Sequence, residues 1–407
     1  MKGLENKEAK EARRYDSVMR AKSYTDVVYG GGKVQNAGQK LQEIVESYRP
    51  EPSRYHIYFG EMHGHTDLSD AAPDIDTYFR VARDLAGLDF CAISDHDHGG
   101  IFSDELWGEK WDLTRRKVKE YAQQGKFLPI LAYERDSYPW YDNLVIYFNS
   151  YDQNIPLGSI PGEITKAELN ELLKREDLLV IPHTTSFLHS GCDFERISDE
   201  LMTPLIEVYS RWGTDEYFGN PNPVRIECRG GFWQDALQKG AKMGCVCGSD
   251  DHQKMPGMMM RQEDHPNLIY PFPGLTAILA EDLTLESIFS ALKARRCYGF
   301  MGGRIWIDFR INGHYMGEEF FLSPDGERFV YFSVEADCPI QCVTVVKNNE
   351  NYMRFQGVPN HNKSNKLEDS FIDYNAATEC DFYYLRIELT DGRFAWTSPI
   401  WLTDKAN

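Results

Sequence analysis

One stretch of the sequence decides the fold and the chemistry that we predict: Ile57-Tyr58-Phe59-Gly60-Glu61-Met62-His63-Gly64-His65-Thr66-Asp67. Its first half is typical of a short β-strand, and the strand ends in two histidines spaced two residues apart. Alternate residues of a strand point to the same face, so both imidazoles converge at the carboxyl end of the strand. Borderline divalent metals prefer such a nitrogen pair, and the stretch therefore predicts a metal site.

Further polar clusters follow other strand-like apolar runs. They are Ser94-Asp95-His96-Asp97-His98 after residues 88–93, Ile181-Pro182-His183-Thr184 after residues 177–180, and Gly248-Ser249-Asp250-Asp251-His252 after residues 243–247. Another apolar run, residues 127–133, ends in Glu134, whose two carboxylate oxygens could bridge two metals. Catalytic groups of parallel α/β barrels and sheets collect at the carboxyl ends of strands, so we expect these segments to meet at one site.

Length and composition limit the class of protein. A chain of 407 residues predicts two or three domains, and contents of 42% hydrophobic and 13% aromatic residues indicate a well-packed globular protein. The net charge of −19 argues against a general nucleic-acid-binding surface, whereas bound cations would still attract a small anionic substrate. No apolar run approaches the length of about 18 residues that a membrane-spanning helix needs.

The cysteines and the N-terminus predict a cytoplasmic protein. Nine cysteines, an odd number without the spacing of a disulfide framework, indicate free thiols in a reducing compartment. The first residues, from Met1 to Lys7, lack the apolar core of a signal peptide.

Three regions are predicted along the chain. Residues 1–54 form a short helical extension, with helices near 7–20 and 39–48 and a glycine hinge at 30–32. Residues 55–301 alternate strand-like runs with helical patterns at 75–85, 111–123, 166–174 and 283–294, which predicts a parallel α/β domain. Residues 302–407 contain alternating strand-like runs and the turn signals Asn312-Gly313 and Asp391-Gly392, which predict an all-β, sandwich-like domain.

The ordered set of clusters resembles the four motifs of the PHP (polymerase and histidinol phosphatase) superfamily over roughly residues 55–260. The matching residues are His63-Gly64-His65-Thr66-Asp67-Leu68-Ser69-Asp70, Asp95-His96, Glu134, His183 and Asp250-Asp251-His252. Within the superfamily the chain looks most like large bacterial proteins that add a C-terminal β domain. The resemblance implies a distorted (β/α)7 barrel with two or three divalent metal ions (zinc, manganese or iron) at the carboxyl ends of its strands.

The resemblance also implies which residues bind metal. The ligands would be His63, His65, Glu134 and Asp250 for the first ion, Glu134 and His183 for the second, and Asp70, His96 and His252 for the third. The alternative for Asp70 is a helix N-terminal residue. The family usually has one more histidine on the strand after the glutamate, and Asn143 occupies its place here. An amide oxygen binds borderline metals less tightly than an imidazole, so the second ion is expected to be weaker, different or absent.

The implied activity is that of a metal-dependent phosphoesterase acting on a small phosphomonoester or phosphodiester. A water bridging two cations has a lowered pKa and supplies hydroxide at neutral pH, while the cations neutralise the phosphoryl oxygens. Asp97 and His98 are candidates for the general acid, and Arg135 and Arg211 for phosphate contacts. A surface salt bridge is the alternative for either arginine.

Two other functions stay open. A metal hydrolase of a non-phosphate ester or amide would use the same nucleophile, because the hydroxide does not dictate the electrophile. A non-catalytic binding protein that retains a metal is the other alternative, and the departure at Asn143 favours it. For the C-terminal β domain, ligand or carbohydrate binding and packing in an oligomer are both open.

Overall fold

The computed structural model describes most of the chain from residue 50 onward. The described residues are 50–97, 104–136, 140–141, 143–155, 164–188, 191–253, 255–259, 270–323, 326–357, 364–374 and 378–404. The helices predicted at 7–20 and 39–48, and the hinge between them, lie outside the described residues. No helix in the described part of the chain is long and apolar enough to cross a membrane.

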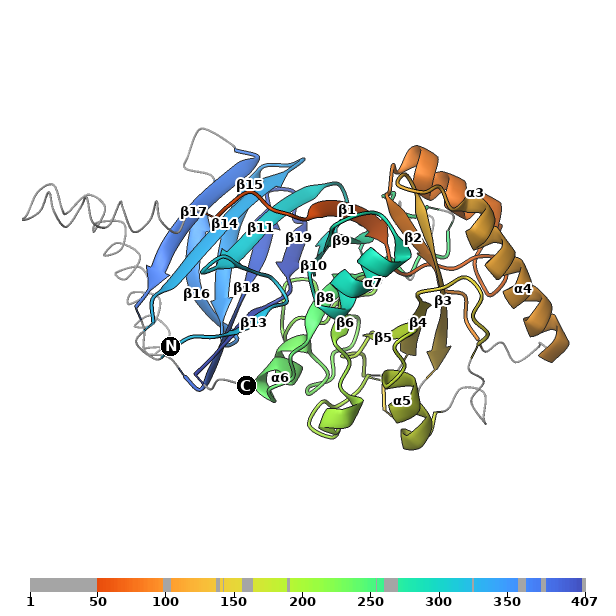
Figure 1. Cartoon of the computed structure of the whole chain (residues 1–407), viewed down its shortest axis with the longest axis horizontal. Helices are drawn as coiled ribbons and strands as arrows, with labels where there is room; N and C mark the ends of the chain where they lie inside the picture. The colour runs from red at the N-terminus through yellow and green to blue at the C-terminus, as the bar shows by residue number, and fades with distance from the viewer. Residues whose placement is uncertain are drawn as a thin grey trace, which may run out of the picture.

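The first part of the described chain mixes strands and helices (Figure 1). Its strands are β1 (His56–Glu61), β2 (Phe90–Ile93), β3 (Leu128–Asp136), β4 (Asn143–Phe148), β5 (Leu178–His183), β6 (Leu205–Ser210), β7 (Gly213–Thr214), β8 (Gly244–Cys247), β9 (Gly274–Ala280) and β10 (Cys297–Met301). Its helices are α3 (Ile75–Arg80), α4 (Asp104–Tyr121), α5 (Lys166–Leu173), α6 (Trp233–Gln238) and α7 (Leu285–Lys293). A π-helical turn, Val81–Leu85, extends α3 to the end of the predicted helix.

The second part of the chain is built of strands. They are β11 (Ile305–Ile311), β12 (His314–Tyr315), β13 (Glu319–Phe321), β14 (Arg328–Ala336), β15 (Ile340–Lys347), β16 (Glu350–Gln356), β17 (Lys366–Asp373), β18 (Cys380–Leu389), β19 (Phe394–Thr397) and β20 (Ile400–Thr403). Both predicted turns are present: Asn312 and Gly313 have φ of 50° and 83° between β11 and β12, and Gly392 has φ of 87° between β18 and β19.

The sheet of the first part is mixed rather than purely parallel. Within the described residues, β1, β2 and β3 are parallel neighbours, but β4 runs antiparallel to both β3 and β5, and β9 antiparallel to β1. The prediction of a parallel sheet is therefore wrong in part. Only residues 137–142 join β3 to β4, and a parallel neighbour would need a crossover of about a dozen residues or more.

The predicted seven-stranded barrel remains a prediction. Strands β6, β7 and β8 form a separate small sheet, with β6 parallel to β8, and no described hydrogen-bond ladder joins β5 to β6. One face of β2 to β5 nevertheless packs into a shared apolar core with β6, β8 and β9. Its members include Phe90, Ile130, Val145, Ile181, Leu205, Val246 and Ile278, all buried.

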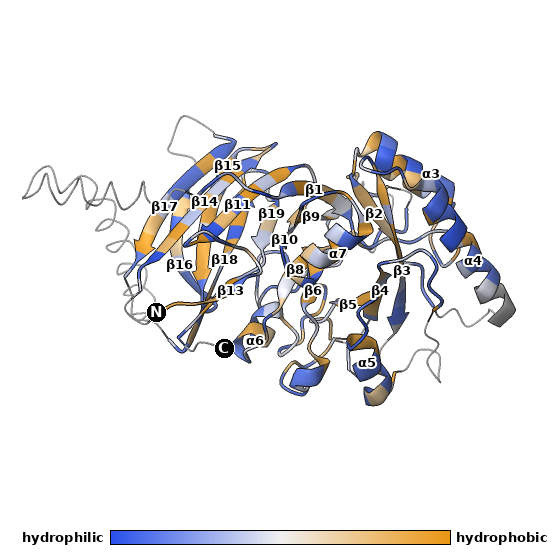
Figure 2. Ribbon diagram, viewed as in Figure 1, coloured by the Kyte–Doolittle hydropathy of each residue, from blue (hydrophilic) through white to orange (hydrophobic). Residues whose placement is uncertain are grey.

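The second part packs two sheets face to face. The described sheet β12-β11-β14-β17 lies against β15, β16 and β18, and its residues Ile305, Ile307 and Phe309 are buried while Trp306 faces outward. Figure 2 shows the same alternation of apolar and polar residues along these strands. Strand β19 also pairs with β10, so the large sheet continues from one part of the chain into the other. The predicted boundary near residue 301 remains a prediction.

Candidate metal centre

The segment His63-Gly64-His65 lies between two other strand-end segments and is hydrogen-bonded to both. On one side, the Asp250 amide donates to the His63 carbonyl (2.9 Å) and the His65 amide donates to the Asp251 carbonyl (2.8 Å). On the other side, the Gly64 amide donates to the Ser94 hydroxyl (3.0 Å), and the Gly64 carbonyl accepts from the Ser94 amide (2.9 Å). Ser94 directly follows β2. The backbone thus extends the sheet past the strand ends and brings the predicted clusters together.

Four side chains meet at the centre of the site: His63, His65, Glu134 and Asp250. The Oε2 atom of Glu134 lies 3.0 Å from His63 Nε2 and 3.1 Å from His65 Nε2, and the two Nε2 atoms are 3.3 Å apart. Asp250 Oδ1 lies 2.9 Å from His65 Nε2. Metal–ligand distances of about 2.0–2.2 Å correspond to separations of about 3.3–3.6 Å between neighbouring ligand atoms in a tetrahedron. The separations here, from 2.9 Å (His65–Asp250) to 3.7 Å (His63–Asp250), scatter around these values, so the four atoms are close enough to share one ion.

Asp250 has features of a residue held for function rather than for packing. Its φ is 52°, in the left-handed region that non-glycine residues seldom adopt. Its Oδ1 is buried and accepts no hydrogen bond among the described residues, although three imidazoles surround it. Its Oδ2 accepts a hydrogen bond from Trp212 Nε1. An oxygen surrounded in this way is suited to a cation.

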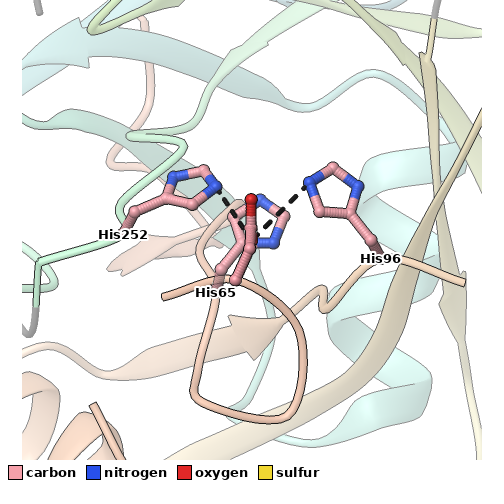
Figure 3. Close-up of side chains that lie close together, drawn as sticks. His65, His96 and His252 are labelled. Atoms are coloured by element: carbon pink, nitrogen blue, oxygen red, sulfur yellow. Dashed lines mark ion pairs between the residues drawn. The ribbon is translucent and has the colours of Figure 1, made fainter. Parts of the chain in front are cut away.

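A second group lies on the more exposed side of His65. It combines His65 with Asp70, His96 and His252, the three residues predicted for the third ion. His96 and His252 lie on either side of His65 (Figure 3), and both stack on its ring with centroid distances of 4.5 and 4.1 Å. Asp70 Oδ1 is 3.3 Å from His252 Nε2 and 3.9 Å from His96 Nε2. The helix-terminal alternative for Asp70 is wrong, because Asp74 is the N-cap of α3.

His183 belongs to a third group, with His63 and a residue that the sequence analysis missed, Glu207. His183 ends β5, and its Nε2 lies 3.3 Å from Asp250 Oδ2. Glu207 lies in the middle of β6, where every residue is buried. A signal was present in the sequence, because Glu207 is the one charged residue of an otherwise apolar strand run, Leu205-Ile206-Glu207-Val208-Tyr209.

Asn143 begins β4 directly opposite His183 in the antiparallel register. Side chains of directly opposed residues lie on the same face of a sheet, so Asn143 is on the face that carries His183. Its role as a replacement for a histidine ligand remains a prediction.

The charges of the centre favour bound cations. Glu134, Asp250 and Glu207 are all buried, and each has a carboxylate oxygen within 3.7 Å of a ring nitrogen of His63. Burial disfavours an imidazolium at His63, but the carboxylates of Glu207 and Glu134 outweigh burial and raise the pKa of His63 to about 9. Several buried carboxylates need compensating positive charge, and divalent metals bound by neutral imidazole nitrogens and carboxylate oxygens supply it. The donor set therefore fits the implied metals.

The candidate catalytic residues are engaged in ion pairs. Arg135 Nη1 is 2.7 Å from Asp97 Oδ2, and Arg211 Nη1 is 2.7 Å from Asp251 Oδ1. Both pairs are buried, so neither arginine forms the surface salt bridge that was the alternative. The predicted phosphate contacts and the general acid Asp97 remain predictions. His98 lies outside the described residues.

Two further buried carboxylates hold the ligand-bearing loops. Glu61 accepts hydrogen bonds from the amide and hydroxyl of Ser249, next to Asp250, and burial raises its pKa to about 8. Asp95 accepts bonds from the amide and hydroxyl of Thr66, both at 2.7 Å. These contacts fix the backbone on either side of the ligands.

All nine cysteines are free thiols, as predicted.

Comparisons with known proteins give distant relatives. The sequence matches no protein-family model. It is 27% identical over 370 residues to an uncharacterised protein of Chlamydia pneumoniae and 24% identical over 369 residues to one of Chlamydia trachomatis, with 85% of this chain covered in each case. The aligned region makes up 57% of each chlamydial protein, so the chain spans little more than half their length.

Solved structures give similarities of low score. A two-domain protein from Bacteroides vulgatus, described as containing a predicted PHP-like metal-dependent phosphoesterase, aligns with 86% of this chain and 97% of its own, at 15% identity and a TM-score of 0.44. The fibronectin(III)-like modules of Clostridium thermocellum CbhA align with 25% of this chain at a TM-score of 0.18.

Proposed function

We propose that the chain is a metal-dependent hydrolase of the PHP superfamily, with a distorted barrel, and that it hydrolyses a small phosphomonoester or phosphodiester. The observation that carries the proposal is the convergence of His63, His65, Glu134 and Asp250, whose ligand atoms lie within 4.8 Å of one another in a buried site. A second group shares His65 and is more exposed, which suits a site that a substrate must reach.

The residues of the chain divide the work of such a reaction. His63 and His65 present nitrogen ligands from one rigid strand end, and Glu134 and Asp250 supply negative charge opposite them. Bound divalent ions would activate a water molecule at neutral pH and withdraw charge from the phosphoryl oxygens. Asp70, His96 and His252 would hold a further ion on the more exposed side, and Asp97 stays the candidate that would protonate the leaving group.

The second candidate is hydrolysis of a non-phosphate ester or amide. The ion pairs of Arg135 and Arg211 favour it, because guanidinium groups already paired with carboxylates are less available to a phosphate. A neutral electrophile would need no such contact.

The two reactions are separated by a substrate test. The purified chain is loaded in turn with Zn²⁺, Mn²⁺ or Fe²⁺ and assayed with p-nitrophenyl phosphate, bis(p-nitrophenyl) phosphate and p-nitrophenyl acetate. We expect hydrolysis of a phosphate ester that is lost in His65→Ala and retained in His56→Ala, an exposed histidine at the start of β1. Hydrolysis of the acetate alone would favour the second candidate, and no hydrolysis with any ion would contradict both.

A further inference from the structure

Glu207 lies between two of the histidines and contacts the same atom of each ring. Its Oε2 is 3.1 Å from His63 Nδ1, and its Oε1 is 2.5 Å from His183 Nδ1. The carboxylate is 2% exposed, and the histidines are 0% and 3% exposed. One buried carboxylate thus accepts a hydrogen bond from each of two predicted metal ligands.

The opposite nitrogens of the two rings face the centre. His63 Nε2 points to Glu134 and His65, and His183 Nε2 lies 3.3 Å from Asp250 Oδ2. The two nitrogens of an imidazole direct their lone pairs away from each other. An ion bound at Nε2 is therefore out of reach of a carboxylate that sits on Nδ1, and Glu207 lies outside the shell of ligands.

We infer that Glu207 is a positioning residue that fixes the tautomer and the orientation of both His63 and His183 for metal binding. This inference rests on the proposed function. A carboxylate only accepts hydrogen bonds, so each Nδ1 carries a proton, and in the neutral ring Nε2 is the nitrogen whose lone pair can bind a metal. Such carboxylate–histidine–metal arrangements orient the ring and increase the basicity of the ligand. Here one carboxylate serves two ligands.

Gly248 provides independent support, because its lack of a side chain makes room for this arrangement. A Cβ atom at position 248 would lie 2.3 Å from Glu207 Oε2 and 2.4 Å from His63 Cβ. Both distances are far below van der Waals contact. The glycine that opens the Gly248-Ser249-Asp250-Asp251-His252 cluster thus lets β8 approach the Glu207–His63 pair closely, while the same cluster supplies Asp250 to the centre.

The test replaces the carboxylate by its isosteric amide, Glu207→Gln. An amide has one accepting oxygen and one donating nitrogen, so it can keep the hydrogen bond of one histidine and must oppose the N–H of the other. We expect the dissociation constant for Zn²⁺, measured by competition with a chromophoric chelator, to rise about 10- to 100-fold. We also expect the Zn²⁺-loaded wild type to show two strongly hydrogen-bonded Nδ1–H resonances in ¹⁵N-histidine NMR spectra, and the variant to lose at least one.

The comparison variant is Glu61→Gln. Glu61 is the same residue type, equally buried and at the end of β1. Its hydrogen-bond partners among the described residues are Ser249 and the His63 backbone amide, and none of them is an imidazole nitrogen. A loss of affinity that is general to removing a buried glutamate near the site would appear in both variants. The inference requires the larger loss, and the altered histidine resonances, in Glu207→Gln.

Two results would overturn the inference: a Zn²⁺ affinity of Glu207→Gln within about threefold of wild type, or unchanged Nδ1–H resonances in that variant. Failure of the proposed function would look different. A wild type that binds no Zn²⁺ would refute the metal centre, whereas the Nδ1–H resonances of His63 and His183 would still report, in the metal-free protein, whether Glu207 holds both rings.

Discussion

Replacing Arg211 by methionine separates the ion-pair role of this arginine from a role in binding phosphate. Arg211 and Asp251 are both fully buried, with 2.7 Å between Nη1 and Oδ1, and Nη2 also donates to the Met258 carbonyl (2.7 Å). Arg211→Met leaves the Asp251 carboxylate buried without its cation. Removing one partner of a buried pair costs about 3–5 kcal/mol, and we expect a loss of this size in the free energy of unfolding.

The assay is urea unfolding followed by circular dichroism, with two companion variants. Arg196→Met removes an arginine that is 87% exposed and paired with Asp193, and it should cost no more than about 1 kcal/mol. Adding Asp251→Asn to Arg211→Met removes the uncompensated charge and should recover part of the loss. A free energy of unfolding of Arg211→Met within about 1 kcal/mol of wild type would show that the buried ion pair does not stabilise the fold. An unchanged stability with a raised KM for a phosphate ester would instead assign Arg211 to the substrate.

Three other predictions follow from the site. Gly248→Ala should lower the free energy of unfolding by about 1–3 kcal/mol through overpacking, whereas Gly108→Ala, with open space around its Cβ, should not lower it. Equal unfolding midpoints of the two variants would contradict this. Zn²⁺ affinity should rise with pH through neutrality, because zinc must displace protons from His63, His65 and His183, whose pKa values are raised by the buried carboxylates. Calorimetry in buffers of different ionisation enthalpy measures the released protons, and a pH-independent affinity is the opposing result. Glu61 ionises near pH 4.5 in the unfolded chain and near pH 8 in the folded chain. Its contribution to the free energy of unfolding is therefore complete below about pH 4.5 and is lost as the pH rises to about 8. Glu61→Gln should flatten the measured pH dependence of unfolding over this interval.

The site was largely predictable because each cluster follows a buried strand. Apolar runs with polar ends predict that His63, Glu134, His183 and Asp250 lie at or near strand ends, and the structure brings His63 together with each of the other three. The apolar runs and the polar residues that follow them are visible in the sequence alone, so this part of the site could be predicted without knowing any tertiary contact.

What the sequence could not supply depends on strand direction and register. The antiparallel direction of β4 could have been inferred from the short connection at residues 137–142, but its register, which sets Asn143 opposite His183, could not. Glu207 is at the middle of β6 rather than at its end, so the strand-end rule passes over it. The arginines gave no signal of their buried partners, because Arg211 pairs with a residue that is 40 positions away in the chain.

Elemental analysis of the purified chain measures whether these side chains hold divalent metal ions. Wild type, His56→Ala and the double variant His63→Ala/His65→Ala are expressed in metal-supplemented medium and analysed together. We expect at least one equivalent of transition metal in wild type and in His56→Ala, and its loss in the double variant. Wild type without metal, or a double variant that retains the same metal content, would show that His63 and His65 do not bind a metal ion.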